Sequence, residues 1–323
     1  MIKLFQFIFC FLTIFFYINI ADAQTWLTSP GHTQIPIWPA EKMPDALSSS
    51  PPETFIISTH HLVAGKTWTE ILNVSKPTMT LYYPKKNRSH AAVIVFPGGG
   101  FNGLAIDLEG TEICHWITSE GMTCVLLKYR VPDSGPAWHY SCHCNIHPKA
   151  PTALEDAQRT ISLVRYNAKK WHINSNKIGV IGFSAGGYMV AEVTADFENR
   201  AYKSLDAVDH ESCRPDFAMA IYPGHMQKRS KSVEKGVFVL NSDIHFTKDT
   251  PPTFIVQAEN DPEDNIDNSL LYYIALKNAG VPVEMHLYAQ GGHAFGLRRT
   301  HFAITRWPQL AQTWLNSIGM LSK

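Results

Sequence analysis

The sequence predicts an α/β fold, with a mainly parallel central sheet and helices on both of its faces. From Met79 onward, short runs rich in Val, Ile, Leu or Phe alternate with amphipathic stretches, as buried parallel strands alternate with crossover helices. A glycine-flanked serine stands directly between one such strand and one such helix. With 323 residues, the chain is long enough to bury the core of one large domain of this kind.

Six strands and three helices define the predicted alternation. The strands are expected at residues 91–96, 123–129, 177–181, 217–222, 253–257 and 283–287. The helices are expected at 152–170, 268–279 and 307–318. Pro151 and Pro308 stand at helix starts, and Gly280 follows a helix end, which are the positions that these residues favour.

The start of the chain predicts export. Lys3 precedes an apolar run at 4–20, and Ala21-Asp22-Ala23 follows as a small-x-small cleavage signal, so residues 1–23 are interpreted as a signal peptide. The alternative is an uncleaved membrane anchor, for which this run is short. We therefore expect a periplasmic or extracellular protein without stable membrane insertion.

The remaining chain divides into two predicted regions. Residues 24–75 are rich in Pro, Ser and Thr and are expected to form an N-terminal arm with edge strands. Residues 76–323 are expected to form the α/β domain. Two long segments, at about 132–149 and 199–248, interrupt the alternation and are interpreted as insertions, because connections are usually short.

The charge balance argues against a nucleic-acid partner. The chain has 28 Lys and Arg residues against 28 Asp and Glu residues, so its formal net charge is zero. Nucleic-acid binding usually requires a basic excess on one face. The composition makes no prediction about the oligomeric state.

The strongest motif is Gly182-Phe183-Ser184-Ala185-Gly186-Gly187, which follows a predicted buried strand and opens an apolar helix. A serine on a tight strand-to-helix turn requires small neighbours and stands exposed at the carboxyl edge of the sheet. Ser184 is therefore the predicted nucleophile. A glycine-rich turn that serves only packing is the alternative interpretation.

A nucleophilic serine requires a base, and the base requires an orienting acid. Of 15 histidines, His293 follows a predicted strand in the glycine-flanked run Gly291-Gly292-His293-Ala294-Phe295-Gly296. Asp261 follows another strand, with Glu259, Glu263 and Asp264 as competitors for the role of the acid. The order Ser184, Asp261, His293 is that expected for this sheet topology.

An oxyanion hole is predicted from Phe96-Pro97-Gly98-Gly99-Gly100-Phe101, which follows the strand at 91–96. Glycines allow backbone N–H groups to approach a substrate closely. We expect the donors to be the amides of Gly99, Gly100 and Ala185. A phosphate-binding loop is the competing interpretation, but the chain has neither the GK[ST] ending nor a GxGxxG pattern that opens a helix.

These motifs together resemble the α/β-hydrolase superfamily. The stretch from Val95 through Gly103-Leu104-Ala105-Ile106-Asp107-Leu108-Glu109-Gly110 to Leu127-Lys128-Tyr129-Arg130-Val131-Pro132 is similar to bacterial exported esterases related to acetyl-xylan esterases, a group often labelled xylanase-like or dienelactone-hydrolase-like. The similarity runs from about Ile37 to the C-terminus. It implies hydrolysis of short acyl esters, commonly acetyl groups on plant polysaccharides, without a cofactor. The expected partner is thus a small ester or an acetylated glycan.

The loop after Pro132 departs from this resemblance. It carries Cys142, Cys144 and three histidines, His139, His143 and His147. A disulfide or a free thiol is the favoured interpretation outside the cell. A structural zinc site is the alternative, which the CxC spacing disfavours because it lacks the usual two-residue gap, so no metal ligand is assigned. Cys114 and Cys124 are expected in the core as buried thiols, with a mutual bridge as the alternative.

Two other functions compete with the esterase. A peptidase of the prolyl-oligopeptidase type shares the triad but usually carries an N-terminal propeller, for which the roughly fifty residues before the first core strands are too few. A non-catalytic binding module on a hydrolase scaffold would normally have lost a member of the triad or a glycine of the oxyanion hole.

Overall fold

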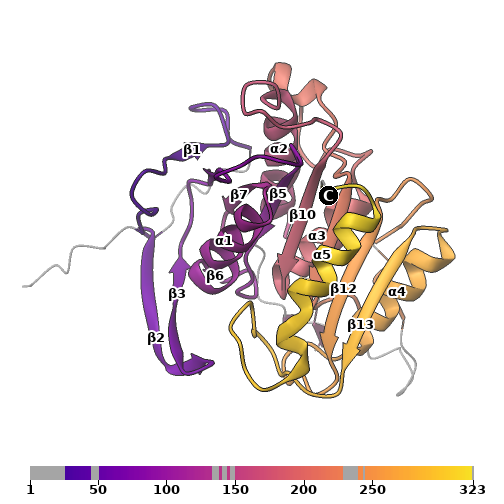
Figure 1. The fold of residues 1–323 in the computed structure, drawn as a ribbon. Coiled ribbons are helices and arrows are strands. Elements are labelled where there is room, and N and C mark those ends of the chain that lie inside the picture. Colours follow the sequence, from indigo (N-terminus) through magenta and orange to yellow (C-terminus); the bar gives the residue numbers. More distant parts are fainter. Residues whose placement is uncertain are drawn as a thin grey trace, which may run out of the picture.

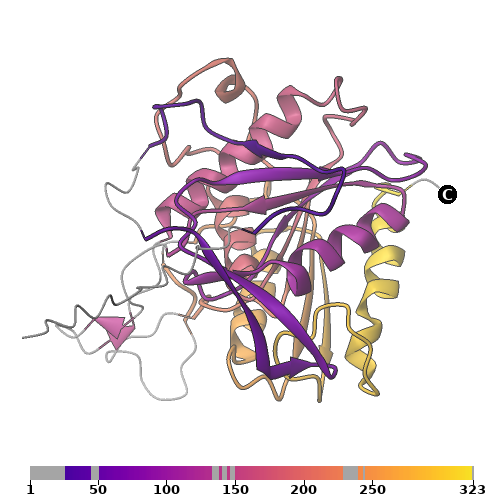
Figure 2. The same cartoon turned by 90° about the vertical axis from the view of Figure 1, so that its left-hand side faces the viewer.

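The computed structural model describes residues 26–44, 51–132, 138–139, 144–145, 150–227, 239–242 and 244–321. The predicted signal peptide at 1–23 lies outside this range, as do most of the predicted insertion at 132–149 and part of the one at 199–248. Figures 1 and 2 show a central sheet between two layers of helices.

The central sheet has eight strands. Six adjacent strands run parallel to one another, and β4 runs antiparallel to both of its neighbours, β1 and β7. The six predicted strands are all present in the parallel part, and each end lies within two residues of its predicted position. The mainly parallel sheet is therefore confirmed. In spatial order the strands are β1 (Gln34–Pro36), β4 (Thr78–Tyr82), β7 (Thr123–Lys128), β5 (Ala92–Phe96), β10 (Ile178–Phe183), β11 (Phe217–Ile221), β12 (Thr253–Ala258) and β13 (Val283–Tyr288).

Helices cover both faces of this sheet. Helices α1 and α5 lie on one face, and α2, α3 and α4 lie on the other (Figures 1 and 2). Trp116 and Trp307 pack edge to face on the first side, with ring centroids 5.2 Å apart. The helices are α1 (Glu112–Ser119), α2 (Pro151–Tyr166), α3 (Ala185–Ala195), α4 (Asp267–Asn278) and α5 (Trp307–Ser317), with short helical turns η1 (Asp107–Thr111), η2 (Ala207–His210) and η3 (Ala303–Arg306). Among the described residues, none of these helices has the length and apolar character of a membrane span.

The N-terminal region forms strands of two different sheets. β1 is the edge strand of the central sheet, whereas β2 (Thr54–Val63) and β3 (Lys66–Leu72) form a hairpin that pairs with β6 (Gly103–Ala105). Ala64 and Gly65 both have positive φ, as a two-residue hairpin turn requires. The hairpin extends beside the body of the molecule (Figure 1). A further two-stranded pair, β8 (Trp138–His139) and β9 (Cys144–Asn145), falls within the predicted insertion at 132–149.

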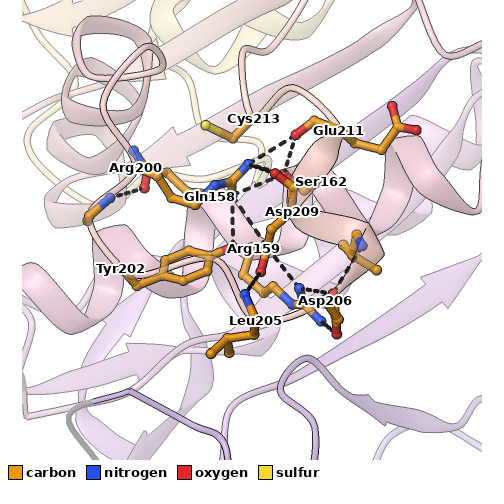
Figure 3. A network of polar contacts seen from close by, with 12 residues as sticks. Gln158, Arg159, Ser162, Arg200, Tyr202, Leu205, Asp206, Asp209, Glu211 and Cys213 are labelled. Atoms are coloured by element: carbon orange, nitrogen blue, oxygen red, sulfur yellow. Dashed lines mark hydrogen bonds and ion pairs between the residues drawn. The ribbon is translucent and has the colours of Figure 1, made fainter.

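The segment at 199–248 is not a single insertion. The central strand β11 lies inside it, so the segment consists of two connections on either side of that strand. The first connection is fixed to α2 by a polar network (Figure 3). Arg159 donates hydrogen bonds of 2.8 Å to Asp206 and Asp209, and the Tyr202 hydroxyl donates to Asp209 at 2.6 Å. Because Arg159 and Asp209 are buried, this network holds the connection against the helix layer.

A disulfide joins Cys114 on α1 to Cys124 on β7. The favoured interpretation of both residues as thiols is therefore wrong, and the alternative of a mutual bridge is correct. Their Cα atoms lie 5.2 Å apart, within the usual range for a bridge, because α1 packs across β7. Periodicity placed both residues in the core but could not show that they face each other. Cys213 is a free, buried thiol, and the side chains of Cys142 and Cys144 are outside the described part.

Candidate active site

Ser184 occupies a sharp turn between β10 and α3, with φ of 52° and ψ of −118°. The two glycines of the motif are required by close contacts in this turn. A Cβ atom on Gly182 would lie 2.0 Å from the Gly186 carbonyl oxygen, and one on Gly186 would lie 2.1 Å from the Phe96 carbonyl oxygen. Both substitutions would displace backbone, so the serine is presented on a turn that only small neighbours allow.

The three residues predicted as a triad form a row in which His293 lies within hydrogen-bond distance of both Ser184 and Asp261. His293 Nε2 is 3.0 Å from Ser184 Oγ, and His293 Nδ1 is 2.8 Å from Asp261 Oδ2. Ser184 follows β10, Asp261 follows β12 and His293 follows β13, so all three stand at the carboxyl edge of the parallel strands. The side chain of Asp261 is fully buried behind the imidazole. This is the geometry of a nucleophile, a base and an orienting acid.

The carboxylate of Asp261 is oriented by three further donors. Gln257 Nε2 donates to its Oδ2 at 3.1 Å, and the backbone N–H groups of Glu263 and Asp264 donate to its Oδ1 at 2.9 and 3.0 Å. Of the competing acids, Glu259 and Glu263 are exposed. Asp261 is therefore the acidic residue that contacts the histidine Nδ1.

Asn260, a residue that the sequence analysis did not single out, joins the loop that carries His293 to the turn that carries Asp261. Asn260 Oδ1 accepts hydrogen bonds from the N–H groups of Gly291 and Gly292 at 2.9 and 3.0 Å. Gly292 has φ of 66°, which glycine adopts without strain. The base and the acid thus lie on loops that are joined directly.

Ala185, one predicted oxyanion donor, follows the nucleophile directly, and Gly99 and Gly100 follow Gly98, which contacts it. Ala185 is the first residue of α3, so its N–H has no acceptor inside the helix. Gly99 has φ of 133°, and a Cβ atom on the neighbouring Gly98 would lie 2.9 Å from the Ser184 Cβ. Within the described residues, no hydrogen bond occupies the N–H of Gly99, Gly100 or Ala185. These amides are therefore available to an oxygen bound beside Ser184.

Glu109, in η1, supports this loop from behind, and the sequence analysis missed this role. Its buried carboxyl accepts hydrogen bonds from the Gly98 N–H at 2.7 Å and from the Tyr222 hydroxyl at 2.8 Å. The Gly296 N–H in turn donates to the Tyr222 hydroxyl at 3.3 Å. Burial raises the pKa of Glu109. Glu109 stood in the stretch that carries the family resemblance, but no spacing rule connects it to Gly98.

Asp264 was considered only as a competitor of Asp261, and the structure gives it a different place. Its Oδ2 lies 3.3 Å from Ser184 Oγ and 3.9 Å from His293 Nε2. It therefore faces the opposite side of the imidazole from Asp261.

Burial by itself lowers the pKa of His293, but its neighbours outweigh this effect. The hydrogen bond and charge of Asp261, followed by the charges of Asp264 and Glu109, raise the pKa above the ordinary value of 6.5. Tyr222, whose ring lies 4.9 Å from the imidazole, has a pKa raised by burial.

The pH dependence of ester hydrolysis is expected to reflect this raised pKa. A histidine that acts as a base must be neutral, so activity is lost as the pH falls through the pKa of His293 in the folded protein. We expect the acidic limb of the kcat/KM profile for p-nitrophenyl acetate to have its midpoint above 6.5. The Ser184→Ala variant supplies the background rate at each pH. A midpoint at or below 6.5 would show that the three carboxyl groups do not outweigh the effect of burial on the pKa of His293.

The sheet topology and the serine on its strand-to-helix turn define an α/β hydrolase. A model of the prolyl oligopeptidase family matches residues 112–318, a range that includes Ser184, Asp261 and His293. The chain belongs to this family. The predicted membership of the α/β-hydrolase superfamily is thereby confirmed.

Three relatives show what the chain is similar to. An acetylxylan esterase of Xylanibacter ruminicola is 26% identical over 269 residues, which cover 76% of this chain and 50% of the relative. Endo-1,4-beta-xylanase B of Butyrivibrio fibrisolvens is 24% identical over 70% of this chain and 36% of the relative. The crystal structure of an acetyl ester-xyloside bifunctional hydrolase from Caldicellulosiruptor lactoaceticus has a TM-score of 0.66 and 29% identity, covering 90% of this chain and 97% of that one.

The predicted relation to acetyl-xylan esterases is confirmed by the first and third of these relatives. The chain spans half the length of the acetylxylan esterase and about a third of the xylanase. The solved hydrolase, in contrast, is matched over nearly its whole length.

Proposed function

We propose that this protein is a serine esterase that removes acetyl groups from carbohydrate through an acyl-enzyme. The observation that carries the proposal is the continuous chain of contacts from Ser184 Oγ to His293 at 3.0 Å and from His293 to Asp261 at 2.8 Å. Free backbone N–H groups beside the serine provide the second requirement of acyl transfer.

In the proposed reaction, Ser184 Oγ attacks the ester carbonyl while His293 Nε2 takes its proton. Asp261 holds the imidazole and balances its charge. The amides of Gly99, Gly100 and Ala185 bind the oxyanion, and each such donor is worth roughly 3 kcal/mol in the transition state. His293 then protonates the departing alcohol, and water repeats the sequence to release the acid.

Acetylated carbohydrate is the substrate class that the relatives support, since two of them are an acetylxylan esterase and an acetyl ester-xyloside hydrolase. The zero net charge is compatible with a neutral substrate that requires no steering field. Export to the periplasm or the medium is part of the proposal. The signal-like residues 1–23 and the disulfide between Cys114 and Cys124 support it, because disulfides persist mainly in oxidising compartments.

A panel of p-nitrophenyl esters from acetate to octanoate, run beside acetylated xylan and a prolyl peptide p-nitroanilide, tests the proposal. We expect kcat/KM to be highest for acetate and to fall by roughly tenfold or more along the series. We also expect acetic acid release from acetylated xylan and no cleavage of the peptide. Activity that rises with acyl length would overturn the acetyl preference.

The panel also tests a peptidase, the second candidate function. The match to the prolyl oligopeptidase family is the observation that favours it. Faster turnover of the peptide than of any ester would establish this alternative. A chain that neither hydrolyses the panel nor reacts with a fluorophosphonate at Ser184 would instead be a binding module.

A further inference from the structure

Asp264 places a second carboxylate directly against the Ser184–His293 pair. Its Oδ2 is 3.3 Å from Ser184 Oγ, at hydrogen-bond distance, and 3.9 Å from His293 Nε2. Only 12% of the side chain is exposed. A triad requires one acid, and Asp261 already fills that role at Nδ1. Asp264 is therefore not required as the orienting acid.

Several contacts hold Asp264 in this position. Its backbone N–H donates to Asp261 Oδ1 at 3.0 Å, and its carbonyl oxygen accepts from Gln257 Nε2 at 2.9 Å. The neighbouring residue on the β11 side is Gly224, where a Cβ atom would lie 2.2 Å from Asp264 Oδ1. Glycine at position 224 thus leaves the space that the carboxylate fills.

The position of Asp264 constrains the groups that can lie beside the reacting ester. During acyl transfer, Ser184 Oγ bonds to the carbonyl carbon, so an atom 3.3 Å from Oγ is within reach of substituents next to the ester. An ionised carboxyl group only accepts hydrogen bonds. An alkyl substituent would cover it without replacing its lost hydration, and an anionic substituent would be repelled. A hydroxyl group would donate to it.

We propose that Asp264 is a specificity-determining residue that accepts a hydrogen bond from a substrate hydroxyl adjacent to the scissile ester. The site would then select hydroxyl-bearing esters, such as partly acetylated sugars, over alkyl esters of the same size. This inference rests on the proposed esterase function and adds that the site recognises a hydroxyl group next to the scissile ester. In the free protein the Ser184 hydroxyl donates to Asp264. A substrate hydroxyl replaces that donor and leaves the serine proton to His293.

Two pairs of esters with matched shapes test the inference and separate the two sides of the ester. 2-Hydroxyethyl acetate against propyl acetate places the hydroxyl on the alcohol side. Ethyl glycolate against ethyl propionate places it on the acyl side. The readout is the ratio of kcat/KM within each pair, because an effect of Asp264 on His293 basicity is common to both members and cancels.

The wild-type protein is expected to prefer the hydroxyl-bearing ester by about tenfold or more in at least one pair, the range of hydrogen bonds to charged groups. Asp264→Ala should bring that ratio close to one, and Asp264→Asn, which keeps an acceptor oxygen, should give an intermediate ratio. A preference in the first pair assigns the hydroxyl to the alcohol, and a preference in the second pair assigns it to the acyl group. Ratios that are the same in wild type and Asp264→Ala for both pairs would overturn the inference.

Glu263→Gln is the matched control, because it removes an exposed carboxylate from the same turn and should keep the wild-type ratios. Fluorophosphonate labelling of Ser184 in each variant shows that the nucleophile is still assembled. The two proposals fail in different ways. If the esterase proposal is wrong, Ser184→Ala will be as active as the wild type. If only this inference is wrong, Ser184→Ala will be inactive, and the kcat/KM ratios of the ester pairs will be the same in Asp264→Ala and in the wild type.

Discussion

Replacement of Ser184 by alanine is expected to lower kcat for p-nitrophenyl acetate by about 10⁴-fold or more. Without Oγ, no acyl-enzyme can form, and His293 Nε2 has no hydroxyl at 3.0 Å from which to take a proton. The amides of Gly99, Gly100 and Ala185 would still bind the carbonyl oxygen. They account for a residual rate above that in water, as in other serine hydrolases that have lost the nucleophile.

This substitution should leave the fold unchanged. Ser184 precedes α3, but its side chain does not cap the helix, so alanine removes no helix contact. Among the described residues, the hydrogen bonds of its Oγ are to His293 and Asp264, both in the active site. The unfolding midpoint of Ser184→Ala should therefore stay close to that of the wild type.

Initial rates and labelling by a fluorophosphonate, followed by intact mass, measure the effect on the full chain. Wild type should gain one phosphonyl group, and Ser184→Ala should gain none. Ser175→Ala is the matched control, because it removes an exposed hydroxyl and should be labelled and active like the wild type. A kcat of Ser184→Ala that falls by much less than about 10⁴-fold would contradict the assignment of the nucleophile.

Local rules were sufficient to predict which residues meet at the site. Ser184, Asp261 and His293 follow the ends of β10, β12 and β13 by one, three and five residues, and parallel strands present their carboxyl ends at one edge. The predicted strands and their order in the chain were therefore enough to predict that His293 meets Asp261, 32 positions away, and Ser184, 109 positions away. The glycines of the turn were predictable for the same local reason, since no side chain fits there.

The residues that the sequence did not predict act through contacts without a local pattern. Glu109 reaches Gly98 only because η1 turns back beneath the glycine loop. Asp264 and Asp261 belong to one short turn and are indistinguishable by type, and only their distances to His293 assign them different roles. The pairing of β3 with β6 was likewise unpredictable, because it depends on a three-residue strand inside the loop that follows β5.

The buried pair of Arg130 and Asp156 is another long-range contact that no local sequence pattern predicts. Arg130 follows β7 and Asp156 lies in α2, and their side chains are 1% and 0% exposed. Arg130 NH2 and Nε donate to Asp156 Oδ1 at 2.8 and 3.1 Å, and the Trp38 indole N–H donates to the same oxygen at 2.7 Å. Arg130 NH1 also donates to the Pro44 carbonyl at 2.7 Å. One ion pair thus joins the N-terminal segment, the sheet and the helix layer.

Replacement of Asp156 by alanine is expected to lower the free energy of unfolding by about 3–5 kcal/mol, because the buried Arg130 loses the carboxylate that accepts from both its Nε and NH2 and keeps only Glu155 as an ion-pair partner. Urea unfolding followed by tryptophan fluorescence measures the change. Glu284→Ala is the matched control, since it breaks the more exposed pair with His286 and should cost no more than about 1 kcal/mol. Equal losses in the two variants would mean that the buried pair is compensated by water or by rearrangement. The expected inequality would mean that Asp156 stabilises the buried Arg130 more than the neighbouring Glu155, which also pairs with Arg130 at 2.8 Å, can do alone.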